Sequence, residues 1–437
     1  MDSSNITHKR ILTISIPIIL SNVTIPLLGL VDTAVIGQLG QVAPIGAVGI
    51  GALIISAIYW IFGFLRMGTT GLTAQAVGRK DSQEIIALLS RTLMIGITAG
   101  LVLILIKDFI FWGAFKVSPA SEEVETLAYS YMKIRIYSAP AAISIFGILG
   151  WLIAQERTRM VLLLQLWMNG SNILLDFLFV IGFNWGVEGV ALATVFAEVS
   201  SFFLGIFICR SAFIGSAWRS FHLVLNKAKI SKMAVVNFDI LIRSMFLQAA
   251  FILFMFLSSD INDDILAINQ ILLQFLSISA YALDGFAFSA EALIGQAFGT
   301  KSVRSLRKVS IFVTFWAFLT AIILTLCFYV GSDFLIVLMT SSEELRESSK
   351  IYVYWVIAAP ILAAPAFILD GIFIGATRTK DMRNCMVISF GIYCLVVWLL
   401  YEPFGNQGLW AALMVMFIVR ALTLFFRYFS IERSIKS

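Results

Sequence analysis

Residues 309–330 read VSIFVTFWAFLTAIILTLCFYV and contain no charged side chain. A transmembrane helix needs about 20 predominantly apolar residues, whereas the strands of a membrane barrel alternate apolar and polar residues over about ten positions. Residues 309–330 are apolar on every side, and so are residues 93–106. Both stretches therefore predict membrane-spanning helices rather than strands.

The composition of the whole chain agrees with this prediction. The 437 residues are 60% hydrophobic and 13% charged, against about 45–50% and about 25% in a soluble domain. This composition excludes a soluble globule and indicates an all-α integral membrane protein. Apolar runs bounded by charged residues and by Gly or Pro predict twelve spans, near residues 11–37, 45–77, 90–113, 131–154, 160–183, 187–209, 235–257, 265–298, 309–331, 351–376, 383–402 and 407–428.

The charges predict the orientation of the chain. Twelve spans place both termini on one side, and most of the 31 Lys and Arg residues fall on that side, which is therefore expected to be cytoplasmic. We expect a multi-pass protein of the cytoplasmic (inner) membrane that keeps its first span, since no signal-peptide pattern is present. The net charge of +5 then reflects orientation and does not indicate a nucleic-acid partner. The bases expected on the opposite side are Lys107, Lys116, Lys133, Arg135, Arg346 and Lys350.

An internal repeat divides the chain. Residues 74–80 read AQAVGRK and residues 295–301 read GQAFGTK, so that Gln75 corresponds to Gln296 at an offset of 221. The same offset relates Gly150 to Gly371. Six spans per repeat predict two lobes of equal orientation, a parallel repeat of the kind found in transporters. The expected units are a lobe at 1–210, a cytoplasmic linker at 211–234 and a second lobe at 235–437.

Acidic residues within the spans carry the functional prediction, because a charge at membrane depth costs about 2.5–3.5 kcal/mol. Asp32 follows Pro17 and Pro26 in the first span, and proline kinks a helix by removing a backbone hydrogen bond. Asn172 and Asp176 are four residues apart, on one helix face that could meet Asp32. The alternative for each of these polar groups is an interhelical bond that serves packing alone.

Other polar residues in the spans are weaker candidates. Thr194 and Glu198 lie one turn apart in the sixth span, although a helical threonine commonly bonds to its own backbone. Asp284 and Asp370 have no acidic counterpart in the first lobe, which indicates different roles for the two lobes. The candidates for lining a substrate cleft are Glu198, Asp284, Glu291 and Asp370, with a structural role left open.

No known enzyme signature appears. Residues 295–302 lack the adjacent Gly-Lys-Ser/Thr of a phosphate-binding loop, and the four cysteines show no metal-binding spacing. His8 and His222 lie in the expected tail and linker, so carboxylates would have to carry any proton across the membrane. These observations predict no enzyme and no resident cofactor, and they favour transport driven by an ion gradient.

Several of these segments resemble one transporter family. Residues 26–37 (PLLGLVDTAVIG), residues 65–78 (LRMGTTGLTAQAVG), the Asn172 and Asp176 pair and the stretch from Asp284 to Gly299 are similar to the DinF-like branch of the multidrug and toxic compound extrusion (MATE) family. The likeness covers essentially all twelve spans. It implies a V-shaped antiporter, expected to be a monomer, that expels organic cationic or amphipathic compounds through a central cleft in exchange for H⁺ or Na⁺.

The resemblance also assigns roles to residues. Asp32, Asn172, Asp176 and Thr194 are implied as the ion-coupling site, where either a proton or Na⁺ would bind, and protonation of Asp32 would accompany bending of the first helix at Pro17 or Pro26. The alternative is a lipid-linked oligosaccharide flippase of the same superfamily, which would need a cationic cleft. Three residues near span ends could supply those charges, namely Arg66, Arg243 and Arg420.

Overall fold

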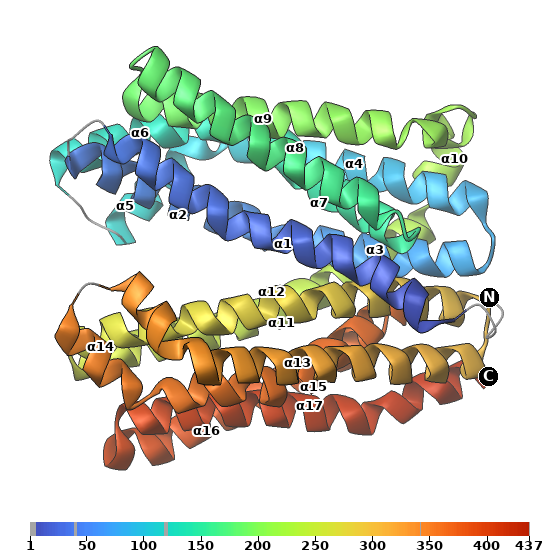
Figure 1. Ribbon diagram of the computed structural model, residues 1–437. Coiled ribbons are helices and arrows are strands. Elements are labelled where there is room, and N and C mark those ends of the chain that lie inside the picture. Colours follow the sequence, from blue (N-terminus) through green and yellow to red (C-terminus); the bar gives the residue numbers. More distant parts are fainter. Residues whose placement is uncertain (1–5, 39–41, 118–120, 341, 437) are drawn as a thin grey trace. The chain divides into compact units, whose positions relative to one another are not determined.

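The protein is helical throughout the residues that its structure, a computed structural model, describes: 6–38, 42–117, 121–340 and 342–436 (Figure 1). No strand occurs in these ranges. Eleven helical segments within them are long and apolar enough to cross a membrane. Helix α1 (His8–Gly37) covers the remaining expected span. The prediction of an all-α, twelve-helix membrane protein is confirmed.

The remaining helices are α2 (Val42–Ile61), α3 (Phe64–Gly78), α4 (Ser82–Leu105), α5 (Lys107–Val117), α6 (Glu122–Arg135), α7 (Ala139–Ala154), α8 (Thr158–Asp176), α9 (Gly186–Ile208), α10 (Phe221–Val224), α11 (Lys227–Ile261), α12 (Asp263–Gly299), α13 (Val303–Met339), α14 (Glu343–Lys350), α15 (Val353–Gly375), α16 (Thr379–Phe404) and α17 (Asn406–Lys436).

Several helix boundaries differ from those expected from the apolar runs. The third span was expected near 90–113, but α4 begins at Ser82 because the Asp81 carboxylate caps its N-terminus, accepting a hydrogen bond from the backbone N–H of Glu84 at 3.0 Å. Helix α11 begins at Lys227, inside the expected linker. The capping and polar residues extend both helices beyond their apolar cores.

By its contacts the chain divides into two compact units, each composed of more than one segment. The N-terminal unit comprises residues 20–69 and 81–232, and the C-terminal unit comprises residues up to Ile19, residues 70–80 and residues from Met233 onward. The division falls within α1, after Ile19, and within α3, after Thr69. The lobe and linker boundaries expected from the repeat stay a prediction.

In the N-terminal unit, helices pack closely where small residues line their faces. Helix α4 packs on α7, α8 on α9, and α6 on both α2 and α9. A Cβ atom at Gly100 would lie 2.2 Å from the backbone nitrogen of Pro140, and one at Gly96 would lie 2.6 Å from Ser144 Oγ. These glycines therefore let α4 approach the backbone of α7, as small residues do in membrane helix pairs.

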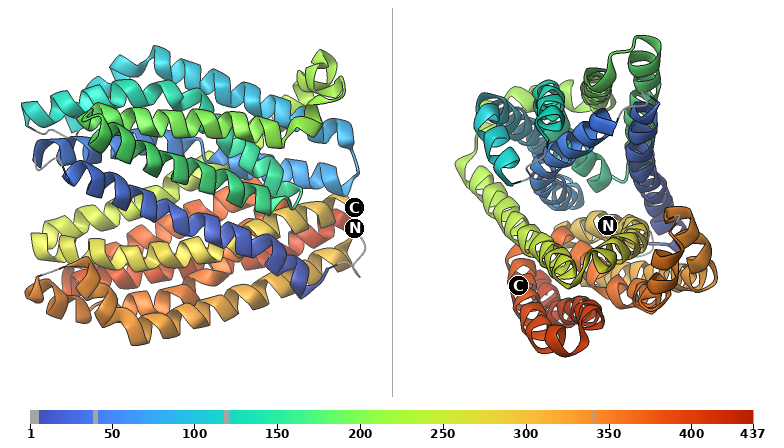
Figure 2. Two further views of the ribbon diagram at one scale, coloured as in Figure 1. Left: turned by 45° about the horizontal axis from the view of Figure 1, so that its top comes forward. Right: turned by 90° about the vertical axis from the view of Figure 1, so that its left-hand side faces the viewer.

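In the C-terminal unit, α12 packs against α13 and α15, and α17 packs against α15 and α16. These helices run side by side in both ribbon views (Figure 2). Their shared core is apolar around Phe254, Tyr393 and Trp410, and the indole N–H of Trp410 donates to Asn269 Oδ1 at 2.9 Å. That bond satisfies the one polar atom of a fully buried tryptophan ring.

The repeated motif forms a reciprocal contact within the C-terminal unit. A Cβ at Gly78 would lie 2.3 Å from the carbonyl oxygen of Gln296, and a Cβ at Gly299 would lie 2.2 Å from the carbonyl oxygen of Gln75. Equivalent residues of the two repeats thus meet each other across the contact between α3 and α12. Only glycine allows the two backbones to come this close.

Candidate ion-coupling site

The four residues assigned to ion coupling converge in the N-terminal unit. Asp32 comes from α1, Asn172 and Asp176 from α8, and Thr194 from α9. With the Asn172 amide nitrogen turned toward α1, it donates to Asp32 Oδ1 at 3.3 Å, and the amide oxygen accepts from Thr194 Oγ1 at 3.1 Å. The hydroxyl of Thr194 also lies within hydrogen-bond distance of the Val190 carbonyl, at 3.0 Å, so the expected back-bonding occurs beside the contact with Asn172.

The carboxyl groups of Asp32 and Asp176 lie close to each other and interact electrostatically. Two carboxylates have acceptors only, so these groups can hydrogen-bond to each other only when one of them carries a proton. Asp176 is fully buried, and its Oδ1 has no hydrogen-bond partner among the described residues. The pair is therefore a place where a proton can be held between two helices.

An irregular turn follows Asp176 directly. Asp176 is the last residue of α8, and residues Phe177–Gly182 form a π-helical turn. Such turns are rare and are found frequently at functional sites. The α-helical hydrogen bonding of α8 therefore ends at the buried Asp176. The apolar periodicity of the sequence does not indicate this π-helical turn.

A second polar cluster lies one turn along α9 from Thr194. Arg135 Nη1 donates to Glu198 Oε2 at 2.7 Å, and Nη2 donates to Oε1 at 3.1 Å. The Arg135 side chain is also fixed by Ser138, whose Oγ accepts from Nη1 at 3.0 Å. The hydroxyl of Tyr59 donates to the carbonyl oxygen of Arg135 at 3.0 Å. The positive charge of Arg135 also attracts the Asp32 carboxylate, which links the two clusters electrostatically.

Arg135 was expected on the side opposite the termini, and that orientation stays a prediction. Its side chain is 6% exposed and is enclosed where α6 gives way to a short 3₁₀ turn at Ile136–Ser138. Glu198, a candidate for lining the cleft, is an ion-paired acid. A buried glutamate needs a positive partner, so the sequence could have indicated that a base lies near Glu198 in the fold. It did not indicate which base, because the partner lies far away in sequence.

The acids of the C-terminal half differ in their surroundings. Asp370 of α15 is paired with two arginines, Arg243 of α11 and Arg420 of α17, and both donate to its Oδ2. It is therefore also not an unpaired carboxylate, because the bases that neutralise it come from helices distant in sequence. Glu291 is 1% exposed and Asp284 is half-buried, both on α12. Asp284, Glu291 and Asp370 belong to the C-terminal unit, whereas Glu198 belongs to the N-terminal unit.

The two prolines assigned to bending both lie inside α1, which is continuous from His8 to Gly37. Pro17 lies two residues before the boundary between the units, and Pro26 lies in the part that belongs to the N-terminal unit. The structure does not bring a proline into the hydrogen-bonded cluster around Asp32. Their role stays a prediction.

Comparison with known proteins shows the family to which this chain belongs. The MatE family model matches residues 17–178 and 240–399. The chain belongs to the MATE family of multidrug and toxic compound transporters, whose members are transporters that use no cofactor. The family predicted from the sequence is thus confirmed.

Particular relatives support this assignment. The chain is 35% identical over 428 residues to the DNA damage-inducible protein F of Escherichia coli, covering 96% of this chain and 91% of the relative. It is 19% identical over 438 residues to a probable multidrug resistance protein NorM of Bacillus cereus, covering 97% of this chain and 96% of the relative. These matches extend over nearly the whole length of both chains in each case.

Solved structures share the fold. A MOP superfamily transporter from Pyrococcus furiosus aligns with a TM-score of 0.89 at 17% identity, covering 98% of this chain and 97% of the other. The Vibrio cholerae MATE transporter VcmN in its bent form aligns with a TM-score of 0.85 at 20% identity, covering 98% of both chains.

Proposed function

We propose that this protein is a secondary active antiporter that exports organic cationic or amphipathic compounds in exchange for protons, with Asp32 as the coupling carboxylate. The proposal rests on the MATE family membership and on the convergence of Asp32, Asn172, Asp176 and Thr194. The expected setting is the cytoplasmic membrane, with both termini in the cytoplasm and the protein acting as a monomer.

The close approach of the carboxyl groups of Asp32 and Asp176 is the observation that carries the choice of the proton. A proton on one of the two groups would join them by a hydrogen bond, which fits a proton-loaded state. Loss of that proton would leave two adjacent negative charges in a buried site, which repel each other strongly. The pair would then separate, and an ion that binds two conformers with different affinity can drive a change between them.

Sodium is the alternative coupling ion. Asp32, Asn172, Asp176 and Thr194 offer side-chain oxygens, which are the ligands that a hard cation prefers. However, the Asn172 amide oxygen already accepts from Thr194 Oγ1 at 3.1 Å, and the carboxyl groups of Asp32 and Asp176 already face each other. Binding of Na⁺ would have to replace both contacts, whereas a proton fits the arrangement as it is.

Bending of α1 is expected at Pro17 rather than at Pro26. The boundary between the two units falls after Ile19, so residues just beyond Pro17 pass from one unit to the other. Pro17 removes a backbone hydrogen bond at that position, which lowers the cost of bending the helix there. A change at Asp32 on the same helix can therefore be converted into movement between units.

The flippase alternative receives less support from the arginines. Arg243 and Arg420 are both held on Asp370, which offsets one of their two positive charges. Arg66 is buried, at 8% exposure. The pairing and the burial of these residues count against the cationic cleft that a flippase would need.

The test is transport of ethidium into inside-out vesicles or proteoliposomes under an imposed ΔpH or an imposed Na⁺ gradient. We expect ΔpH-driven uptake by the wild type and no such uptake by the Asp32→Asn variant. The control Asp264→Asn changes an exposed acid of α12 and should leave uptake intact. Undiminished ΔpH-driven transport by the Asp32→Asn protein would overturn the assignment. Uptake that responds to the Na⁺ gradient alone would replace the proton by Na⁺.

A further inference from the structure

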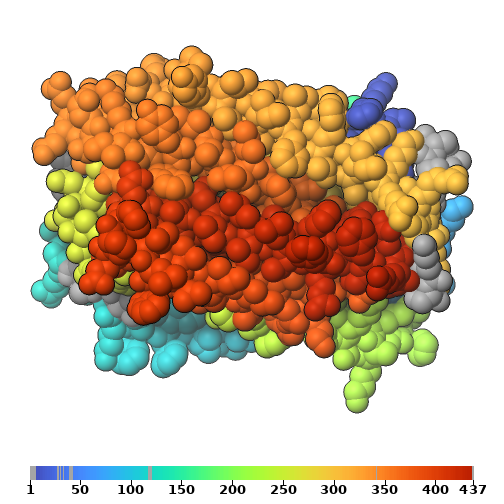
Figure 3. Space-filling model, turned by 90° about the horizontal axis from the view of Figure 1, so that it is seen from below, coloured from blue at the N-terminus to red at the C-terminus, as the bar shows by residue number. Residues whose placement is uncertain are grey.

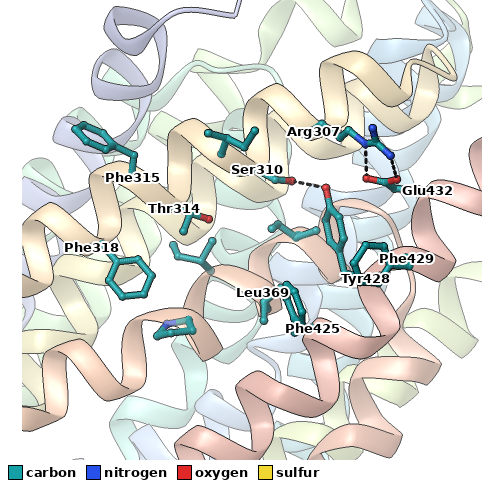
Figure 4. Close-up of a pocket in the computed structure, with 14 residues that line it drawn as sticks. Arg307, Ser310, Thr314, Phe315, Phe318, Leu369, Phe425, Tyr428, Phe429 and Glu432 are labelled. Carbon is teal, nitrogen blue, oxygen red and sulfur yellow. Dashed lines mark hydrogen bonds and ion pairs between the residues drawn. The ribbon is translucent and has the colours of Figure 1, made fainter.

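The C-terminal unit contains an apolar groove that the proposed coupling site does not use. It has a volume of about 750 Å³ and is lined by residues of α13, α15 and α17. This volume lies within the range of about 300–1,000 Å³ that is usual for small-molecule sites. Its walls are mostly aliphatic and aromatic, with Phe315 and Phe318 on α13, Leu369 on α15 and Phe425 on α17 (Figure 4).

The charged residues of the groove lie at one end, and Thr314 is a further polar residue along its length. Arg307, near the start of α13, donates from Nε to Glu432 Oε1 at 2.8 Å and from Nη2 to Oε2 at 2.6 Å. One turn further into the groove, the hydroxyl of Tyr428 donates to Ser310 Oγ at 3.2 Å. These bonds tie α13 to α17 (Figure 4). The groove is thus amphipathic, with a polar end next to the C-terminus of α17 and an apolar interior.

The polar end presents positive charge outward. The Glu432 side chain is 9% exposed, whereas the Arg307 side chain that neutralises it is 59% exposed. A guanidinium has five N–H donors, and Glu432 takes two of them, so donors remain for a second acceptor. Further exposed bases stand at the same ends of α13 and α17, namely Lys301, Arg304, Arg427 and Arg433.

We propose that this groove binds one anionic phospholipid from the membrane leaflet on the side of the chain termini. An acyl chain would lie along Phe315, Phe318 and Leu369, and the phosphate would accept hydrogen bonds from the outward donors of Arg307. Basic pockets between membrane helices bind anionic headgroups in this manner. Helices α13 and α17 both lie on the face of the molecule seen in Figure 3. Charge complementarity favours an anionic lipid over an organic cation, because Glu432, the only acid among the described residues that line the groove, is already paired.

The proposal is tested with the full chain in detergent, mixed with equal amounts of phosphatidylglycerol and phosphatidylcholine and examined by native mass spectrometry. The wild-type protein is expected to retain one phosphatidylglycerol in preference to phosphatidylcholine. Arg307→Gln is expected to abolish this preference, and Leu369→Trp, which fills the groove, is expected to reduce retention of both lipids. The matched controls Arg159→Gln and Leu326→Trp change an exposed base of α8 and an exposed apolar residue of α13 that do not line the groove, and they should retain phosphatidylglycerol like the wild type.

The double variant Arg307→Gln/Glu432→Gln keeps the test valid if the single arginine variant fails to fold, because it removes both charges together. Loss of the phosphatidylglycerol preference in the double variant supports the proposal. Equal retention of the two lipids by the wild type would overturn it, and so would unchanged preference in the Arg307 variants. An effect of Leu326→Trp as large as that of Leu369→Trp would also overturn it, since lipid would then bind without regard to the groove.

Discussion

Arg135 of α6 and Glu198 of α9 form a buried, bidentate ion pair one helical turn from Thr194. Removing one partner leaves the other charged and buried, which costs about 3–5 kcal/mol in comparable pairs. We expect Glu198→Gln to lower the free energy of unfolding by about this amount, and Arg135→Gln/Glu198→Gln to recover most of it. Denaturation of the purified protein followed by circular dichroism measures both. A double variant as unstable as the single one would show that the pair does not act as a unit.

Replacing Arg135 by lysine separates charge from geometry. Lysine keeps the positive charge but cannot donate in the fork that holds both oxygens of Glu198. We expect Arg135→Lys to fold and to shift the pH at which ΔpH-driven ethidium transport is half-maximal, because the charge that attracts Asp32 is no longer held in place. Arg427→Lys, at an exposed position, is the control. An unchanged pH profile would exclude a positioning role for Arg135.

Thr194 distinguishes the two coupling ions. In the proton hypothesis its hydroxyl only orients Asn172, and the loss of one hydrogen bond costs about 0.5–1.5 kcal/mol. Thr194→Val should therefore lower thermal stability modestly while ΔpH-driven transport continues, whereas Thr194→Ser should resemble the wild type. If Na⁺ were the ion, Thr194→Val would abolish Na⁺-driven transport that Thr194→Ser retains. Parallel transport assays under the two gradients decide between these outcomes.

Asp370 is expected to have a structural role. Asp370→Asn would leave Arg243 and Arg420 without the carboxylate that both contact, so we expect a loss of about 3–5 kcal/mol of stability. Asp264→Asn, at an exposed position, should change stability by less than about 0.5 kcal/mol. The melting temperatures of the two variants provide the comparison. An Asp370→Asn protein that is as stable as the wild type but deficient in transport would instead make Asp370 a functional acid.

The reciprocal glycine contact predicts two sensitive positions. A methyl group at Gly78 or Gly299 would meet backbone oxygens at 2.3 and 2.2 Å, so either Gly→Ala change should cost at least about 1–3 kcal/mol. Gly331 on α13 has nothing within 4 Å of its added Cβ, and Gly331→Ala should be neutral or stabilising by up to about 1 kcal/mol. Thermal unfolding of the three variants in detergent checks this. Equal melting temperatures would contradict the close backbone approach.

Pro17 and Pro26 give a test of the bending hypothesis. Pro17→Ala restores a backbone N–H two residues before the unit boundary, whereas Pro26→Ala does so within the N-terminal unit. We expect Pro17→Ala to reduce coupled transport more strongly while both variants remain folded. Equal transport by Pro17→Ala and the wild type would refute bending at Pro17.

The sequence alone determined the fold class and predicted four candidate coupling residues. Apolar runs long enough to span a bilayer impose helices, because backbone groups in lipid must be hydrogen-bonded within their own segment. The spacing of Asn172 and Asp176 placed both on one helix face, and the family resemblance added Asp32 and Thr194. The repeat of residues 74–80 at residues 295–301 was also found from the sequence, because the two stretches can be recognised by comparing their residues directly.

Only the tertiary structure decided which buried charges are available. The sequence predicted Glu198 and Asp370 as candidate functional acids at membrane depth. In the structure, Glu198 is paired with Arg135. Asp370 is paired with Arg243 and Arg420. These partners come from helices far apart in the chain, and no local pattern encodes which helices meet. The close approach of Asp32 to Asp176 likewise depends on how α1 lies against α8. Charge pairing in a membrane is therefore settled by helix packing, because low dielectric makes a nearby counter-charge far more valuable than it is in water.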